Sequence, residues 1–486
     1  MTDSTPRSNV ASGRLTGATW LGILGGAVAF AYLSYITYIG KGAGGHEAGR
    51  GHTPPLWACF PFAALLLCIA LLPLIPFTAH WWEHNRNRLA VSLVFAAMTL
   101  AYYAIWDGVA TVTTVLQHAL MDEYVPFMVL LFCLYVISGG INLRGDLPAH
   151  AGTNTAFLGV GALLASFIGT TGASMLLIRP LLQTNSERKH VVHTVIFFIF
   201  LVSNIGGSLL PIGDPPLFLG YLRGVPFLWT LNLVWEWLAA IGILLGLYFI
   251  VDTVAHNREE KRDLVVDDAV KVPLRLTGKI NFAYLLAVVL CVALLDPSKE
   301  LFGHRPFPLM RELLMVGVVV LSLLTTPVGV RQANKFNYAA ILEVAALFIG
   351  IFICMQVPIA ILHEKGASLG LSLPWHFFWA TGALSSFLDN APTYVVFFET
   401  ARVLPPVGVT LTLADGGVIS TSYLTAVSLG AVFMGAMTYI GNGPNFMVKS
   451  IAEQSGVKMP SFFGYMSWSV GILIPLFILL TFLFIR

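Results

Sequence analysis

Two aspartates lie inside apolar segments that are long enough to enter a membrane. Asp389 stands in SSFLDNAPTYVVF, next to Asn390 and shortly before Pro392. A proline interrupts a helix and frees backbone carbonyl groups. A carboxylate, an amide oxygen and free carbonyls suit a small hard cation such as sodium or lithium, and the same carboxylate can take a proton. We therefore predict Asp389 and Asn390 as sodium ligands; the alternative is a buried acid that accepts hydrogen bonds from backbone amides at a turn.

Asp214, the second aspartate, lies in SNIGGSLLPIGDPPLF, where glycine pairs and consecutive prolines prevent a continuous helix. Broken membrane helices leave their ends facing a cavity, where they bind ions. Two roles stay open for Asp214: a direct ligand, or the N-cap of a helix that starts at Pro215. The other candidates for the cation and proton site are polar residues at the same breaks: Asn204, Thr170, Thr171, Ser174, Thr393, Thr438, Asn442 and Asn445.

Three further charged residues lie in or beside apolar segments. Arg179 follows GTTGASMLLI, and it could be a counterion for either aspartate, an anchor for a substrate carboxylate, or a residue that extends to the membrane surface. Glu123 and Glu343 each open an apolar span, so we expect both at the membrane interface.

The composition requires a membrane around these residues. Of 486 residues, 57% are hydrophobic and 11% are charged, which is far more apolar than a water-soluble surface allows. The net charge is +2 and the basic residues are dispersed among loops, so nucleic acid is not an expected partner. The chain has no HExxH motif. We therefore expect neither enzymatic activity nor a cofactor.

Apolar runs of about 20 residues, the length that crosses a bilayer as a helix, recur along the whole chain. They predict eleven spans, near 18–40, 57–77, 89–107, 125–144, 190–213, 226–252, 280–296, 309–328, 341–362, 420–441 and 462–485. Two further stretches, 154–183 and 375–402, are interrupted midway at GTTG and LDNAP. Each predicts a re-entrant helical hairpin, because irregular backbone in a membrane must be satisfied by protein or water.

The two halves of the chain repeat one another. ALLASFIGTTG aligns with GALSSFLDNAP, and GGSLLPIGDPPLF aligns with MGAMTYIGNGPNF, so Asp214 matches Asn442. Each copy contains five spans and one hairpin, and an odd number of crossings inverts the second copy. The predicted fold is thus an all-α polytopic membrane protein with two inverted repeats, each with a hairpin and a broken helix. Its divisions are 1–56 (tail and extra span), 57–252 (first repeat), 253–279 (charged cytoplasmic linker) and 280–486 (second repeat).

With SSFLDNAPTYVVF, SNIGGSLLPIGDPP and TYIGNGPNF, the chain resembles the ion transporter superfamily, which includes NhaD-type sodium/proton antiporters, arsenite transporters and citrate/dicarboxylate transporters. The resemblance covers roughly residues 57–485. It implies a dimerising scaffold and a transport region that moves like an elevator, in a bacterial inner membrane. It places cation sites at 170–174, 389–393, 204–214 and 442–445. Dicarboxylate carriers of this superfamily have Ser-Asn-Thr at both hairpin tips, which this chain lacks.

Our leading hypothesis from the sequence is exchange of cytoplasmic sodium or lithium for external protons, with Asp389 alternating between cation and proton. Competition for one carboxylate couples the two fluxes without further machinery. The alternative is uptake of an organic anion such as citrate, driven by sodium or protons, in which hairpin hydroxyls and Arg179 hold the substrate carboxylates.

Overall fold

The computed structural model describes residues 54–259, 272–295 and 307–485. The predicted extra span at 18–40 lies outside these ranges, as does the middle of the predicted linker at 253–279. The described chain is mostly helical, in agreement with the prediction of a helical membrane protein.

The first half contains helices of very different length around one short strand. Its elements are η1 Leu56–Cys59, α2 Phe60–Leu71, α3 Pro76–Trp82, α4 Asn85–Trp106, α5 Val109–Gln117, η2 His118–Tyr124, α6 Val125–Ser138, β1 Asn142–Asp146, α7 Ala151–Ile168, α8 Thr170–Thr184, α9 Val192–Leu201, η3 Ile205–Ser208, α10 Pro215–Leu222, η4 Phe227–Leu233 and α11 Val234–His256.

The second half shows a similar alternation of long and interrupted helices. Its elements are β2 Val272–Thr277, α13 Ile280–Leu294, α14 Met310–Thr325, α15 Val328–Ala333, α16 Ala339–Cys354, α17 Gln356–Lys365, η5 Gly366–Leu369, α18 Pro374–Ser385, α19 Asn390–Arg402, β3 Thr410–Thr412, β4 Val418–Ser420, α20 Thr421–Met434, η6 Gly435–Met437, α21 Gly443–Gln454 and α22 Phe462–Phe484.

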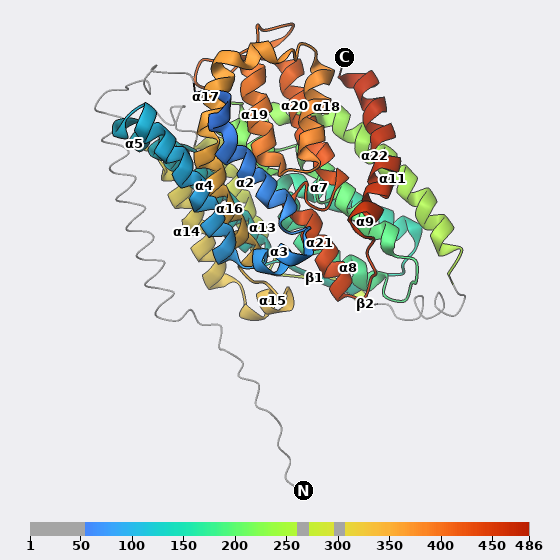
Figure 1. The fold of residues 1–486 in the computed structure, drawn as a ribbon. Helices are drawn as coiled ribbons and strands as arrows, with labels where there is room; N and C mark the ends of the chain where they lie inside the picture. Colours follow the sequence, from blue (N-terminus) through green and yellow to red (C-terminus); the bar gives the residue numbers. More distant parts are fainter. Residues whose placement is uncertain (1–53, 260–271, 296–306, 486) are drawn as a thin grey trace.

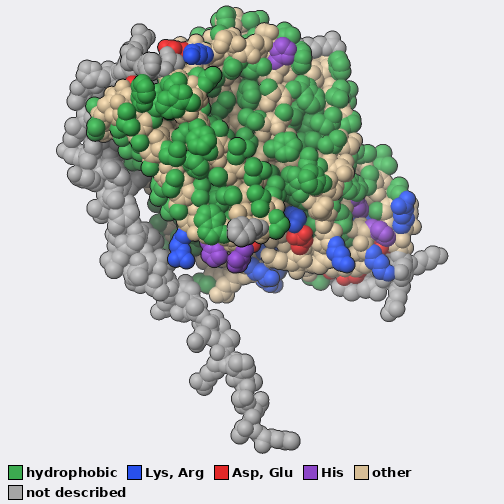
Figure 2. Space-filling model, in the orientation of Figure 1, with side chains coloured by type: hydrophobic (Ala, Val, Ile, Leu, Met, Phe, Trp, Pro, Cys, Tyr) green, Lys and Arg blue, Asp and Glu red, His purple; other side chains and the backbone are tan. Residues whose placement is uncertain are grey.

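The helices form two groups that lie side by side (Figure 1). In one group α4 packs along α16, and α6 packs against α13 and α14; in the other α18 packs along α20, and α7 packs against α8 and α11. Aromatic rings fill the interior: Phe127 of α6 stacks on Phe348 of α16 with ring centroids 4.9 Å apart. Hydrophobic side chains cover most of the visible outer face, and Lys, Arg and His gather along its lower edge (Figure 2).

Within the described residues, six continuous helices are long and apolar enough to cross a membrane, by length and composition. They are Asn85–Trp106, Val109–Ser138, Ala151–Ile168, Phe227–His256, Ala339–Leu369 and Phe462–Phe484.

The helix that contains the predicted span 125–144 begins earlier, at Val109, and passes through His118, Asp122 and Glu123. Charged residues made that segment look like a loop, although Glu123 is buried and ion-paired to Arg223. Our prediction of Glu123 as an interfacial residue is therefore wrong.

Both predicted interruptions occur where the sequence places them. Gly169, with φ of +79°, separates α7 from α8, in a backbone conformation that favours glycine. In the second stretch, residues 386–389 separate α18 from α19. In each pair the two helices pack against each other.

Two short antiparallel sheets are the part of the described fold that an all-α prediction misses. Strand β1 pairs with β2, and β3 pairs with β4. The predicted linker at 253–279 therefore contains a strand, β2, which is anchored next to α8 through its pairing with β1.

Candidate functional site

Two interrupted helices bring the candidate site together. Between α9 and α10 the chain turns through η3, and between α20 and α21 it turns through η6. These turns need glycine, because a side chain would collide with the backbone. A Cβ at Gly213 would lie 2.2 Å from the Gly207 carbonyl oxygen. A Cβ at Gly441 would lie 2.6 Å from the Gly435 carbonyl oxygen. Prolines at the first turn of α10 and α21 then restart the helices.

The two halves make matching contacts at these turns. Ser166 Oγ donates to the Gly206 carbonyl at 2.5 Å, and Ser386 Oγ donates to the Met434 carbonyl at 3.2 Å. Ser166 aligns with Ser386 in the sequence comparison above, and Gly206 aligns with Met434. Serines at equivalent positions thus lie within hydrogen-bond distance of the interrupted helix of their own half, while the shorter contact of Ser386 is with the Gly382 carbonyl, at 2.8 Å.

Asp214 is the centre of the polar cluster formed there. Its Oδ1 accepts hydrogen bonds from Thr170 Oγ1 at 2.9 Å and from Asn442 Nδ2 at 3.1 Å. Its Oδ2 accepts one from Asn390 Nδ2 at 2.7 Å. Although Asp214 stands at the N-cap position of α10, its side chain makes no capping hydrogen bond. Of the two predicted roles, the side chain does not perform the cap, and the ligand role stays a prediction.

Two more asparagines extend the cluster across the two halves. Asn204 Nδ2 donates to Asn445 Oδ1 at 2.7 Å, and Asn204 Oδ1 accepts from Asn442 Nδ2 at 3.2 Å. Asn445 Nδ2 donates to the carbonyls of Gly435 and Thr438 at 2.8 and 2.9 Å. We call this set the Asp214 cluster; its members, all buried, are Asp214, Thr170, Asn204, Asn390, Asn442 and Asn445.

One atom of the Asp214 cluster lacks a partner among the residues that the structure describes. Asn390 Oδ1 is buried and accepts no hydrogen bond, while the Nδ2 of the same amide is bound to Asp214. An unsatisfied buried acceptor is costly. It is also a ready ligand for a cation beside the carboxylate.

Asp389 has a different environment. It is half-buried, and its Oδ1 accepts from the backbone N–H of Ala391 at 3.0 Å, which makes it the N-cap of α19. Thr393 Oγ1 donates to the Asp389 backbone carbonyl at 3.0 Å. These contacts correspond to the alternative considered for Asp389, a carboxylate bound to backbone amides at a turn.

The remaining predicted residues lie around the cluster without binding Asp214. Ser174 shares a hydrogen bond with Ser203 at 2.8 Å, and Thr438 donates to the Ser386 carbonyl at 2.5 Å. Thr171 is half-buried. Arg179 is also half-buried and forms no ion pair within the described ranges; it lies nine residues beyond Thr170, or about 13 Å along α8.

A charge network at the far end of α10, buried except for His363, was not predicted from the sequence. Arg223 donates to Glu123, and its Nε donates to Glu399 Oε1 at 3.0 Å. Gln356 Nε2 donates to Glu123 Oε2 at 3.0 Å, and His363 Nε2 lies 3.0 Å from Glu399 Oε2. These five residues, the Arg223 network, tie α10 and α19 to η2 and α17. Glu123 at the start of an apolar run was the available signal, but its partner is distant in sequence.

A second unpredicted network joins the first hairpin to α11. Asp252 accepts from Arg188 Nη2 at 2.7 Å and from Asn154 Nδ2 at 3.2 Å, and it lies 2.8 Å from His193 Nε2. All four side chains are buried. The network closes one end of α7, α9 and α11.

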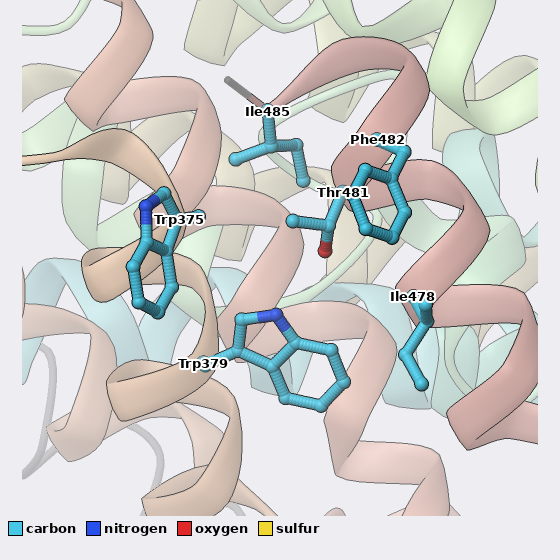
Figure 3. A pocket seen from close by; sticks show the side chains of 6 residues that line it. All are labelled: Trp375, Trp379, Ile478, Thr481, Phe482 and Ile485. Carbon is cyan, nitrogen blue, oxygen red and sulfur yellow. The ribbon is translucent and has the colours of Figure 1, made fainter.

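An open groove of about 500 Å³ lies between α18 and α22 (Figure 3). Trp375 and Trp379 face side chains of α22 and its C-terminal end, and the hydroxyl of Thr481 is the one polar group drawn on that side. The described residues that line the groove include no charged ligand for an ion or a carboxylate, and none of them belongs to the Asp214 cluster.

Comparison with known proteins places the chain in a transport family. Residues 51–485 match the family described as "Putative citrate transport". No curated protein matches the chain. With its apolar helices, the chain is therefore a multi-pass membrane protein that belongs to this transport family.

Proposed function

We propose that this protein is a secondary transporter that exchanges sodium or lithium for protons, and that Asp214 is the carboxylate that binds them in turn. The observation that carries the proposal is the setting of Asp214: a buried carboxylate with three neutral side-chain donors and no basic side chain in contact among the described residues. A buried carboxylate without a counter-charge is unstable as an anion. It therefore needs either a proton or a cation.

The neighbouring amides suit both states. When no cation is bound, Asn390 and Asn442 donate their N–H groups to Asp214. Rotation of either amide would present its carbonyl oxygen instead. A sodium ion beside Asp214 would then have the carboxylate and up to two amide oxygens as ligands, which are the oxygen types that hard cations prefer. Proton and cation compete for one group, and this competition couples their fluxes.

The arrangement of the chain supports alternating access. The matching serine contacts and the matching glycine turns favour two repeats, at 57–252 and 280–486, inverted by their odd number of crossings. The Asp214 cluster then lies where the repeats meet, with Thr170, Asn204 and Asp214 from one and Asn390, Asn442 and Asn445 from the other. Our proposal includes an elevator movement of the hairpins and broken helices, a homodimer through the group of α4 and α16, and a bacterial inner membrane.

The family description favours a second candidate, the coupled uptake of citrate or a similar organic anion. In that case Asp214 would bind the driving cation or proton. The helix starts of α8 and α19 would face the substrate carboxylates, because helix N-termini attract anions.

Liposomes containing the purified protein and an imposed pH gradient distinguish these functions. Sodium, lithium, potassium or labelled citrate is added in turn, and proton movement and citrate uptake are recorded. We expect sodium and lithium to collapse the gradient in wild type, and we expect no response from Asp214→Asn. Asp389→Asn is the matched control and should keep the response. A wild type that ignores cations but accumulates citrate would overturn the exchange proposal in favour of the second candidate.

A further inference from the structure

Two arginines of the β1–β2 sheet lie directly opposite each other. Arg144 of β1 is the register partner of Arg275 of β2, so both side chains project from the same face of the sheet. Both side chains are exposed, and neither forms a hydrogen bond or an ion pair with another described residue. Like charges at directly opposite positions destabilise a two-stranded sheet, so this pair favours an anionic partner.

The same face forms the floor of an open hollow of about 760 Å³. Asn142 and Thr277, two positions along and therefore the next register pair on the same face, continue the polar floor beside the two arginines. The rest of the lining is largely apolar and comes from β2 and from α15 with its preceding residue: Val272, Pro273, Leu274, Pro327, Gly329, Val330 and Ala333. Val272 and Leu274 are 48% and 45% exposed. The hollow therefore offers two guanidinium groups beside apolar walls.

The hollow also lies where membrane helices end. Helix α13 begins at Ile280, shortly after Thr277, and α14 ends at Thr325, shortly before Pro327. Strands β1 and β2 and helix α15 lie at the lower edge of the molecule, along which basic side chains gather (Figures 1 and 2). A ligand in this hollow could contact the polar boundary with its charged part and the helix ends with an apolar part.

We propose that this hollow binds an anionic phospholipid, with its phosphate between Arg144 and Arg275 and an acyl chain against the apolar wall. Guanidinium groups bind phosphate oxygens through paired hydrogen bonds. Basic pockets at the ends of membrane helices are known to suit anionic headgroups. A free inorganic anion fits the arginines but leaves the apolar wall exposed, which is why the hollow favours a lipid.

The bound lipid would stabilise the β1–β2 sheet, which packs against α8 of the first hairpin. Strand β1 precedes α7 and packs against α8, and β2 leads into α13. A phosphate that bridges Arg144 and Arg275 would cross-link the two strands at the point where their side chains repel each other.

Native mass spectrometry of the full chain in detergent tests this proposal, with phosphatidylglycerol, phosphatidylcholine or inorganic phosphate added. We expect wild type to retain one more phosphatidylglycerol than the variant Arg144→Gln/Arg275→Gln, with affinity reduced about tenfold or more in the variant. Arg275→Gln alone should show a smaller loss. The matched control Arg86→Gln/Arg258→Gln removes two exposed arginines outside the hollow and should bind as wild type does.

Three results would overturn the proposal. The double variant could retain phosphatidylglycerol as well as wild type does. Phosphatidylcholine could bind with equal affinity, in which case the arginines do not select the headgroup. Millimolar inorganic phosphate could displace the lipid completely, in which case the hollow is a free-anion site. A melting temperature close to that of wild type confirms that the double variant is folded.

Discussion

The Asp214 cluster and the Arg223 network lie at opposite ends of the same two helices. They differ in the charge of the groups that contact their buried carboxylates. Helices α10 and α19 begin at the cluster and end beside the network. At one end Glu123 and Glu399 are bound to a guanidinium; at the other, Asp214 is bound to amides and a hydroxyl. A carboxylate paired with arginine keeps its charge. A carboxylate surrounded by neutral donors can exchange a proton for a cation.

The largest expected effect is that of Asp214→Asn, which keeps the side-chain shape and removes the exchangeable charge. Coupled transport should be lost. At sodium concentrations near 100 times the dissociation constant, ligand binding stabilises wild type by about 2.7 kcal/mol, and the variant should show none of this gain. Because protons compete for the same group, the gain in wild type should increase as pH rises. Thermal unfolding at several sodium concentrations and pH values measures both effects. If sodium still stabilises the variant, Asp214 is not a sodium ligand.

The next largest effect is expected from Arg223→Gln. Removing the guanidinium leaves Glu123 with Gln356 and Glu399 with His363 as their named partners in the network. Breaking a buried ion pair costs about 3–5 kcal/mol. Thermal or denaturant unfolding in detergent measures this loss. Arg402→Gln, which breaks the more exposed pair with Asp415, is the control and should cost no more than about 1 kcal/mol. Equal effects of the two variants would mean that the Arg223 network is hydrated.

Asn390→Ala should have an intermediate effect. It removes both the 2.7 Å donor to Asp214 and the unpartnered oxygen next to it. A hydrogen bond to a charged group contributes about 1.5–3 kcal/mol, so sodium affinity should fall by about tenfold or more. Isothermal titration with sodium measures the change, and Asn257→Ala, an exposed asparagine, serves as the control. If sodium binds Asn390→Ala as tightly as wild type, the amide oxygen is not a ligand.

Asp389→Ala should have the smallest effect. Losing an N-cap costs about 0.5–2 kcal/mol of stability, and Asp389 makes its capping contact within its own helix. Sodium-driven proton movement should persist near the wild-type rate. If the Asp389→Ala protein is folded but has lost exchange, Asp389 is the coupling carboxylate, as the sequence predicts.

Sequence comparison placed all four breaks correctly. Gly169, residues 386–389, and the turns before Pro215 and Pro444 interrupt helices where the sequence predicted it. Glycine and proline determine backbone conformation locally, so a linear pattern is enough to find them. The same pattern selected all six members of the Asp214 cluster among its candidates, because polar residues at membrane breaks are rare.

The sequence ranks Asp389 above Asp214 as the coupling residue, and our proposal reverses that order. Asp214 and Asp389 have similar local surroundings, since each directly precedes a helix with a proline in its first turn. What distinguishes them is the arrival of Thr170, Asn390 and Asn442 at Asp214 from distant segments. The Arg223 network was missed for the same reason, because Arg223 and Glu399 are far apart along the chain.

The sequence by itself determined that this chain is a helical membrane protein with interrupted segments, since apolar length and helix-breaking residues act locally. The tertiary structure alone decided which carboxylate is surrounded by neutral donors, which are held by arginine, and which only caps a helix. Those environments depend on contacts between segments that are far apart in the chain. Whether a carboxylate binds a proton or a cation depends on the side chains that contact it. The sequence alone therefore could not locate the proposed site, because its residues come from both halves of the chain.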